Sequence, residues 1–167
     1  MKRLNAKVSL GYGIGTFSES SFYQFVNTFQ LVFLTSVAGI DSAMAGTIVS
    51  LTILADAAGT VFIGHISDNL RCRFGRRRPL ILLSTIVNPL IFLMCFVTVD
   101  QPKEIQFIYY LITGALFWVA YSLYYIPYSA LGAEVAEGYN ERIQLRSVSR
   151  FFSVAGSCLA SAVPLAA

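Results

Sequence analysis

An arginine-rich segment separates two long apolar runs in the first half of the sequence. Residues 64–79 read GHISDNLRCRFGRRRP and hold five arginines against the single acid Asp68. The core of a soluble protein does not accommodate such a segment between apolar runs of this length. A short cytoplasmic loop between two transmembrane helices is expected to hold this excess of arginine. The pattern therefore predicts a membrane protein with a cytoplasmic loop at residues 67–78.

The composition excludes several other classes of protein. Hydrophobic residues make up 56% of the chain and charged residues 13%, with a mean hydropathy of +0.65. The net charge of +3 does not indicate nucleic-acid binding, because eleven of the twelve Lys and Arg residues lie in three clusters beside apolar runs. The three cysteines match no metal-ligand spacing. We expect no metal, no organic cofactor and no enzyme activity.

Five apolar runs predict an all-α membrane protein. Each of the first four has at least the ~20 residues that a bilayer requires. The fifth stops at the last residue, so we expect the chain to be a partial N-terminal transmembrane bundle. The predicted helices cover approximately residues 8–35, 43–66, 79–99, 105–128 and 150–167.

The distribution of basic residues predicts the orientation of these helices. With a cytoplasmic N-terminus, the inner segments hold eleven Lys and Arg residues and the outer segments hold only Lys103. This split follows the positive-inside rule. The expected location is the inner or plasma membrane, crossed several times.

Two acids, Glu19 and Asp56, lie inside predicted spans. At 1.5 Å per residue Glu19 falls about 16 Å from the inner end of its span and Asp56 about 20 Å from the outer end of its span, so both lie close to mid-membrane. Burying an acid there costs at least ~2.5 kcal/mol, so such residues usually face a water-filled cavity and serve transport. The alternative is a protonated acid hydrogen-bonded to a neighbouring helix.

Polar residues on two faces give candidate binding sites. Helical spacing places Glu19, Tyr23 and Asn27 on one face of the first span with Ser20 beside them, which predicts substrate contact; hydrogen bonding between helices is the alternative. Four-residue spacing stacks oxygen atoms around the second acid and predicts a site for Na⁺ or H⁺. The predicted cation-binding residues are Thr52, Asp56 and Thr60.

Aromatic residues follow one face of the fourth predicted span. Trp118, Tyr121 and Tyr125 are spaced three and four apart. Their rings suit stacking on a sugar and their hydroxyls suit bonding to it. An aromatic belt at the membrane interface is the alternative, and it fits Tyr109 and Tyr110 near the other end of the span.

Four segments together resemble a transporter family. Gly64, Asp68 and the run 73–79 (RFGRRRP) resemble the loop between helices 2 and 3 of the major facilitator superfamily. The segments GYGIG (11–15), IPYSAL (126–131) and residues 141–152, ERIQLRSVSRFF, narrow this to the glycoside-pentoside-hexuronide:cation symporters, the group of the melibiose carrier. The resemblance covers the whole chain, as the first five of the family's twelve helices.

The resemblance assigns roles to particular residues. It implies that Asp56 is the cation-site acid of helix 2 and that Arg150 lies near the sugar. Ser20 and Tyr125 stand where the melibiose carrier has sugar-binding acids, and Thr60 replaces its second cation-site acid. These replacements favour H⁺ over Na⁺ and a substrate other than melibiose.

The resemblance also implies alternating access, with a sugar or glycoside, the lipid bilayer and the missing C-terminal helices as partners. In this mechanism the arginine loop acts as a conformational latch, whose contacts persist in one state and break in the other. The simpler alternative is that the loop only determines the orientation of the helices in the membrane. The latch residues are Gly64, Asp68, Arg71, Arg76 and Arg77.

These observations leave three alternative hypotheses for the function. The first is cation-coupled symport of a sugar or glycoside, with this chain as an incomplete N-terminal half. The second is a small oligomeric carrier. The third is a nonfunctional or partner-binding membrane remnant. Because the chain stops inside a span, we favour the first function and expect no transport by these 167 residues alone.

Overall fold

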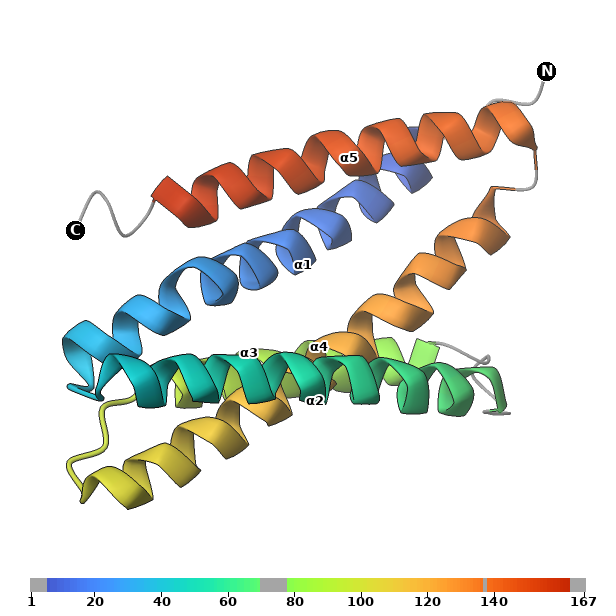
Figure 1. Cartoon of the computed structure of the whole chain (residues 1–167). Helices are drawn as coiled ribbons and strands as arrows, with labels where there is room; N and C mark the ends of the chain where they lie inside the picture. The colour runs from blue at the N-terminus through green and yellow to red at the C-terminus, as the bar shows by residue number, and fades with distance from the viewer. Residues whose placement is uncertain (1–5, 70–77, 137, 163–167) are drawn as a thin grey trace. The chain divides into compact units, whose positions relative to one another are not determined.

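The computed structural model of the chain describes residues 6–69, 78–136 and 138–162, and of Asp68 and Arg78 the backbone only. Every regular element in these ranges is a helix (Figure 1). The elements are α1 (Ala6–Val32), the π-helix η1 (Phe33–Val37), α2 (Ser42–Asn69), α3 (Arg78–Cys95), α4 (Lys103–Val135) and α5 (Tyr139–Ala162).

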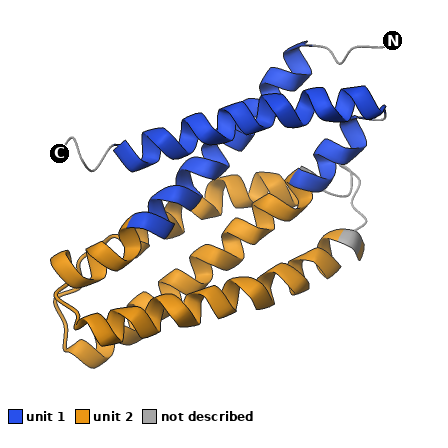
Figure 2. Ribbon diagram, turned by 45° about the horizontal axis from the view of Figure 1, so that its top comes forward, with its two compact units in different colours: residues 1–28, 129–167 blue, residues 29–128 orange. Residues whose placement is uncertain are grey.

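The chain divides into two compact units, coloured separately in Figure 2. The terminal unit comprises residues 1–28 and 129–167, and the central unit comprises residues 29–128. α1 and α4 each contribute residues to both units, because the division falls within these two helices. The terminal unit thus contains most of α1, the end of α4 and all of α5.

Glycines allow close packing within the terminal unit. A β-carbon at Gly156 of α5 would lie 2.6 Å from the carbonyl oxygen of Phe17 in α1, and a β-carbon at Gly13 would collide with the ring of Phe152. Small residues are typical of helix contacts in membranes, because they let two backbones approach. α1 and α5 therefore pack closely along these positions.

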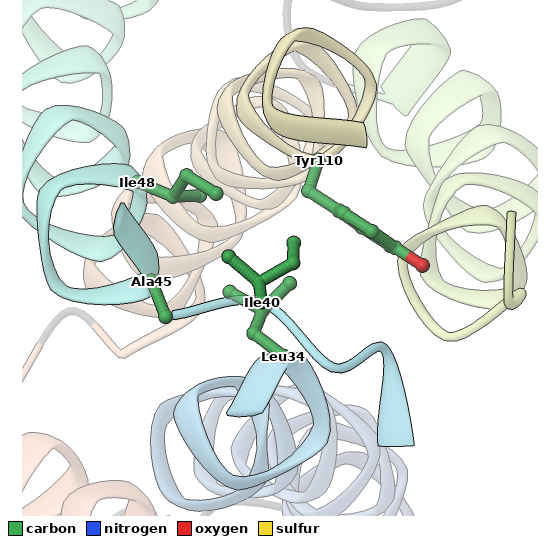
Figure 3. Packing of buried hydrophobic residues seen from close by; sticks show 5 residues of the cluster. All are labelled: Leu34, Ile40, Ala45, Ile48 and Tyr110. Carbon is green, nitrogen blue, oxygen red and sulfur yellow. The ribbon is translucent and has the colours of Figure 1, made fainter. Parts of the chain in front are cut away.

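A buried apolar cluster joins three elements of the central unit. Figure 3 shows Leu34, Ile40, Ala45 and Ile48 turned toward one another beside Tyr110, all at most 3% exposed. The backbone reverses direction here at Gly39, whose φ of +67° is the left-handed conformation that favours glycine. This cluster connects η1 and the start of α2 to α4.

Side chains of α4 hold the connection that follows α3. The hydroxyls of Tyr109 and Tyr110 donate to the carbonyl oxygens of Met94 and Val97, both at 2.9 Å, and Gln106 donates to that of Val99 at 2.8 Å. Unpaired carbonyl groups at a helix end are thereby satisfied. A role in an aromatic belt at the membrane interface, the alternative for Tyr109 and Tyr110, does not predict these hydrogen bonds.

The burial pattern of α3 is the reverse of that in a water-soluble helix. Ser84 and Asn88 are 0% and 7% exposed, whereas Leu82, Ile86 and Leu90 are 67%, 67% and 59% exposed. Polar side chains thus face the protein, and a leucine and isoleucine stripe faces outward. This arrangement suits a lipid environment, where interhelical contacts are rich in polar residues.

Two helices in the described part of the chain could cross a membrane by their length and composition. Ser42–Ser67 and Lys103–Val135 are long and apolar enough to span a bilayer, and Pro79–Cys95 is a shorter apolar helix.

Two helix boundaries differ most from those expected. α4 continues through Pro127 to Val135, whereas we expected it to end near residue 128. α5 begins at Tyr139 rather than near residue 150. The Glu141 side chain accepts a hydrogen bond from the backbone N–H of Gly138 at 3.2 Å, which satisfies a free donor at the start of the helix. Polar residues had obscured this helix in the hydropathy pattern.

Candidate functional site

A cluster of three oxygen-bearing side chains joins α2 to α4 in the central unit. The Ser122 hydroxyl donates to Asp56 Oδ1 at 2.9 Å, and the hydroxyls of Ser122 and Thr60 are 3.2 Å apart. Asp56 and Thr60 lie one turn apart on α2, so their side chains project on the same face. We call Asp56, Thr60 and Ser122 the carboxylate cluster.

Thr52 lies one turn from Asp56 on the same helix, but its surroundings differ. It is 0% exposed, and its hydroxyl donates to the carbonyl oxygen of Val49 at 2.8 Å. Its methyl group lies beside Gly114 of α4, as does the side-chain nitrogen of Gln30. The structure thus places Thr52 in a helix contact, and its predicted role as a cation ligand stays a prediction.

The aromatic residues of α4 form a continuous stack in the central unit. Trp118 meets Tyr121 edge to face at 5.9 Å, and Tyr121 stacks in parallel on Tyr125 at 5.8 Å. Trp118 is 5% exposed and Tyr121 is 8% exposed, whereas Tyr125 is 48% exposed. Of the three rings, that of Tyr125 is therefore accessible, and those of Trp118 and Tyr121 are buried.

The terminal unit holds a second polar cluster. The Ser20 hydroxyl lies 2.7 Å from that of Ser153 in α5 and 3.3 Å from Glu19 Oε2. Because a hydroxyl has one proton, Ser20 donates to one of these oxygens at a time. If Ser20 donates to Glu19, Ser153 can donate to Ser20. Glu19, Ser20 and Ser153 form what we call the hydroxyl cluster.

The other predicted substrate-binding residues of this unit lie on exposed parts of its helices. Tyr23 is 39% exposed and Asn27 is also exposed, one turn apart on α1. Arg150 is exposed on α5, three residues before Ser153. The roles of these three residues in substrate binding stay predictions.

Part of the predicted latch lies outside the described residues. Arg71, Arg76 and Arg77 fall in the segment 70–77, and Asp68 is described by its backbone alone, within α2. Gly64 is in α2 with no atom within 4 Å of a β-carbon placed there. The latch therefore stays a prediction from the sequence.

The carboxylate cluster has the chemistry of a site for a hard monovalent cation. One carboxylate and two hydroxyls supply oxygen ligands, and the carboxylate alone can also hold a proton. Within residues 6–69, 78–136 and 138–162, no group of three or more His, Cys, Asp or Glu side chains could hold a metal ion. The donors in this cluster are hard oxygens, which do not suit a soft transition metal.

Residues 11–167 match the protein family described as MFS/sugar transport protein. The chain belongs to this family. Its relatives are named as transporters and symporters, not as enzymes.

Three relatives illustrate the similarity. The uncharacterized symporter YnaJ of Bacillus subtilis is 32% identical over 168 residues, covering 100% of this chain and 36% of the relative. The uncharacterized symporter sll1374 of Synechocystis is 34% identical, covering 95% and 30%. The glucuronide carrier protein homolog of Escherichia coli is 28% identical, covering 86% and 32%. The chain thus spans about a third of the length of these relatives.

Two residues of these clusters were not among the predicted site residues. Ser122 lies four residues after Trp118, and we assigned that face of α4 to sugar contact rather than to Asp56. Ser153 belongs to a series of serines at four-residue spacing on α5, Ser149, Ser153, Ser157 and Ser161. This spacing identifies a polar face, but it does not identify which residue of α1 the face meets.

Proposed function

We propose that this chain is the N-terminal part of a symporter that couples entry of a cation, H⁺ or Na⁺, to uptake of a sugar or glycoside. The observation that supports it best is the carboxylate cluster. An acid on one apolar helix receives a hydrogen bond from a hydroxyl of another, 66 residues further along the chain. Acids at such positions in membrane helices commonly serve ion binding.

In this proposal Asp56 binds the cation, with Thr60 and Ser122 as neutral oxygen ligands. Thr52 stays a candidate ligand, one turn away. A carboxylate with two hydroxyls satisfies Na⁺ only in part, because hard cations take about six oxygen ligands. Backbone carbonyls or water would complete the shell of Na⁺, whereas H⁺ needs only the carboxylate.

We assign sugar recognition to residues of each unit separately. In the central unit, the exposed ring of Tyr125 offers a stacking surface, and Tyr121 supports it from behind. In the terminal unit, Arg150 and the hydroxyl cluster offer donors and acceptors for sugar hydroxyls, with Tyr23 and Asn27 nearby on α1. The name of one relative, a glucuronide carrier homolog, agrees with a sugar-derived substrate.

The arrangement in the membrane is also part of the proposal. We infer several crossings of the inner or plasma membrane, a cytoplasmic N-terminus and a cytoplasmic arginine loop, from the distribution of basic residues. Transport by alternating access would require helices beyond the present chain, with the arginine loop as a latch. The length of the relatives is consistent with such additional helices.

Cation binding can be tested on the chain itself, reconstituted in lipid nanodiscs. Trp118 is the only tryptophan, and it lies one turn from Ser122 on α4. We expect NaCl, LiCl or a change of pH to alter its fluorescence, and KCl to serve as the control for ionic strength. No response to Na⁺, Li⁺ or H⁺ would contradict the proposal.

Transport is tested in a full-length protein that carries these residues as its N-terminal part. Uptake of a panel of radiolabelled glycosides into proteoliposomes should require a cation gradient. The 167-residue chain alone should show no uptake. Uptake that proceeds equally without any Na⁺ or proton gradient would contradict symport and favour a facilitated carrier.

A further inference from the structure

Two glycines, one on each helix, set the distance between α2 and α4 near the carboxylate cluster. A β-carbon at Gly114 of α4 would lie 2.8 Å from Thr52 Cγ2, and a β-carbon at Gly59 of α2 would lie 3.1 Å from Val119 Cγ2. Real β-carbons essentially never approach other atoms as closely as the first distance. Neither position can accept a methyl group without a shift of its neighbour.

The neighbour of Gly114 cannot turn away easily. Thr52 is 0% exposed, and its χ1 angle is held by the hydrogen bond from its hydroxyl to the Val49 carbonyl. A β-branched side chain in a helix has few alternative rotamers. Gln30 Nε2 also lies 2.9 Å from the same position, but it is the end of a flexible side chain and can move. A methyl group at residue 114 therefore displaces the helix rather than the threonine.

We propose that Gly114 and Gly59 are positioning residues for cation binding at the carboxylate cluster. This inference rests on the proposed function. Raising the contact at Thr52 from 2.8 Å to an ordinary 3.4 Å requires the helices to separate by about 0.6 Å. If Ser122 and Asp56 move apart by the same amount, their hydrogen bond lengthens from 2.9 Å to about 3.5 Å. Hydroxyl hydrogen bonds are normally 2.5–3.0 Å long, so this bond would be lost.

The expected loss of affinity depends on the size of the ion. Li⁺ needs its oxygen ligands closer together than Na⁺ does, because it is the smaller cation. Separation of Asp56 from Ser122 should therefore weaken Li⁺ binding more than Na⁺ binding. A general loss of packing would weaken both ions together with the stability of the chain. The ratio of the two affinities thus distinguishes a positioning role from a structural one.

The test uses Trp118 fluorescence of the chain in nanodiscs, titrated with NaCl and LiCl. We expect Gly114→Ala to weaken Na⁺ binding about tenfold and Li⁺ binding more, because the ion loses the Ser122 oxygen as a ligand, a loss comparable to that of one hydrogen bond to a charged group. Gly46→Ala is the matched control, because Gly46 also lies in α2 and has no atom within 4 Å of its β-carbon position. It should bind both ions as the unmodified chain does.

A second variant tests whether the contact with the Thr52 methyl group causes the loss of affinity. Serine lacks the Cγ2 methyl of threonine, so Gly114→Ala introduced in a Thr52→Ser background should cost much less than tenfold. Val119→Ala should relieve Gly59→Ala in the same way. If Gly114→Ala does not insert or fold, the Gly59→Ala and Val119→Ala pair provides the same comparison.

The outcomes are distinct. Unchanged ion binding in Gly114→Ala and Gly59→Ala overturns the inference, and so does a loss that Thr52→Ser fails to reduce in a folded protein. If only H⁺ alters the fluorescence of the unmodified chain, the pH midpoint replaces the ion affinity. A Gly114→Ala variant that responds to H⁺ as the unmodified chain does would then overturn the inference. Absence of any response in the unmodified chain refutes the proposed function, and this inference with it.

Discussion

The carboxylate cluster of the central unit and the hydroxyl cluster of the terminal unit differ in the hydrogen bond that joins their helices. Asp56 of α2 accepts directly from Ser122 of α4 at 2.9 Å. Glu19 of α1 accepts from its neighbour Ser20 at 3.3 Å, and Ser20 in turn meets Ser153 of α5 at 2.7 Å. The first link between helices therefore includes the carboxylate, and the second is a bond between two neutral hydroxyls.

This difference separates an ion-binding role from a recognition role. Hydrogen bonds to charged groups contribute about 1.5–3 kcal/mol, and those between neutral groups about 0.5–1.5 kcal/mol. A change of charge at Asp56 should alter the contact between α2 and α4 strongly. The bond between Ser20 and Ser153 joins two neutral groups, so a change at Glu19 should alter that bond less. We therefore expect substitutions in the two clusters to affect different measurements.

The largest expected effect is that of Asp56→Asn in the full-length protein. Asparagine keeps the size of the side chain and removes its charge, so cation-dependent uptake should be abolished. Energy-independent sugar exchange should persist in part, because the hydroxyl cluster is unchanged. The measurements are cation-driven uptake and counterflow exchange in proteoliposomes.

Glu19→Gln is the matched comparison for Asp56→Asn. It also replaces a mid-span acid by its amide, and it should lower sugar affinity while uptake continues to depend on the cation. Loss of cation dependence in Glu19→Gln, with retention in Asp56→Asn, would reverse our assignment of the two acids.

A smaller effect is expected for Arg150→Ala, which tests sugar recognition in the terminal unit. Arg150 is exposed on α5 near Ser153 and can donate several hydrogen bonds to sugar hydroxyls. Loss of such contacts should raise the Kd for the sugar by about 10- to 100-fold, at about 1.5–3 kcal/mol. The measurement is binding of a labelled glycoside, with the amount of protein in the membrane as the control. Normal affinity would make Arg150 an interfacial anchor only.

Ser122→Ala should have a moderate effect on the carboxylate cluster. A metal cation bound at Asp56 loses one oxygen ligand, so affinity for Na⁺ or Li⁺ should fall about tenfold. Ser122→Thr keeps the hydroxyl and should retain most of the affinity. If Ser122→Ala binds Na⁺, Li⁺ and H⁺ as the unmodified chain does, the bond between Ser122 and Asp56 has no part in ion binding.

The sequence predicted the helical class and that both acids lie within helices, because both depend on local patterns. Long apolar runs and the spacing of Asp56 from Thr60 are properties of one helix. The partner of Asp56 could not be predicted in this way, since Ser122 and Asp56 meet only when α2 packs on α4. The position of Thr52 next to Gly114 is likewise a consequence of packing between helices.

Boundaries were less predictable where polar residues lie inside helices. The beginning of α5 contains Arg142, Arg146 and Arg150. Hydropathy alone therefore predicted that the helix begins near residue 150, after its true start at Tyr139. The spacing of Gly138 and Glu141 was the available signal, because an acid three residues after a helix start often accepts a backbone N–H. α4 continues through Pro127 because neighbouring groups in membrane proteins can compensate for one missing hydrogen bond.

The smallest expected effect is that of Ser153→Ala in the hydroxyl cluster. Ser20 loses its 2.7 Å bond across the two helices, but its hydroxyl can still donate to Glu19. No buried hydroxyl is left without an acceptor, so the free energy of unfolding should fall by only about 0.5–1.5 kcal/mol. Thermal unfolding of the reconstituted chain measures this change, with Ser153→Thr as the control that keeps a hydroxyl. Cation affinity should be unaltered. A change in cation affinity as large as that of Ser122→Ala would show that the hydroxyl cluster contributes to ion binding, and the contrast between the two clusters would then be wrong.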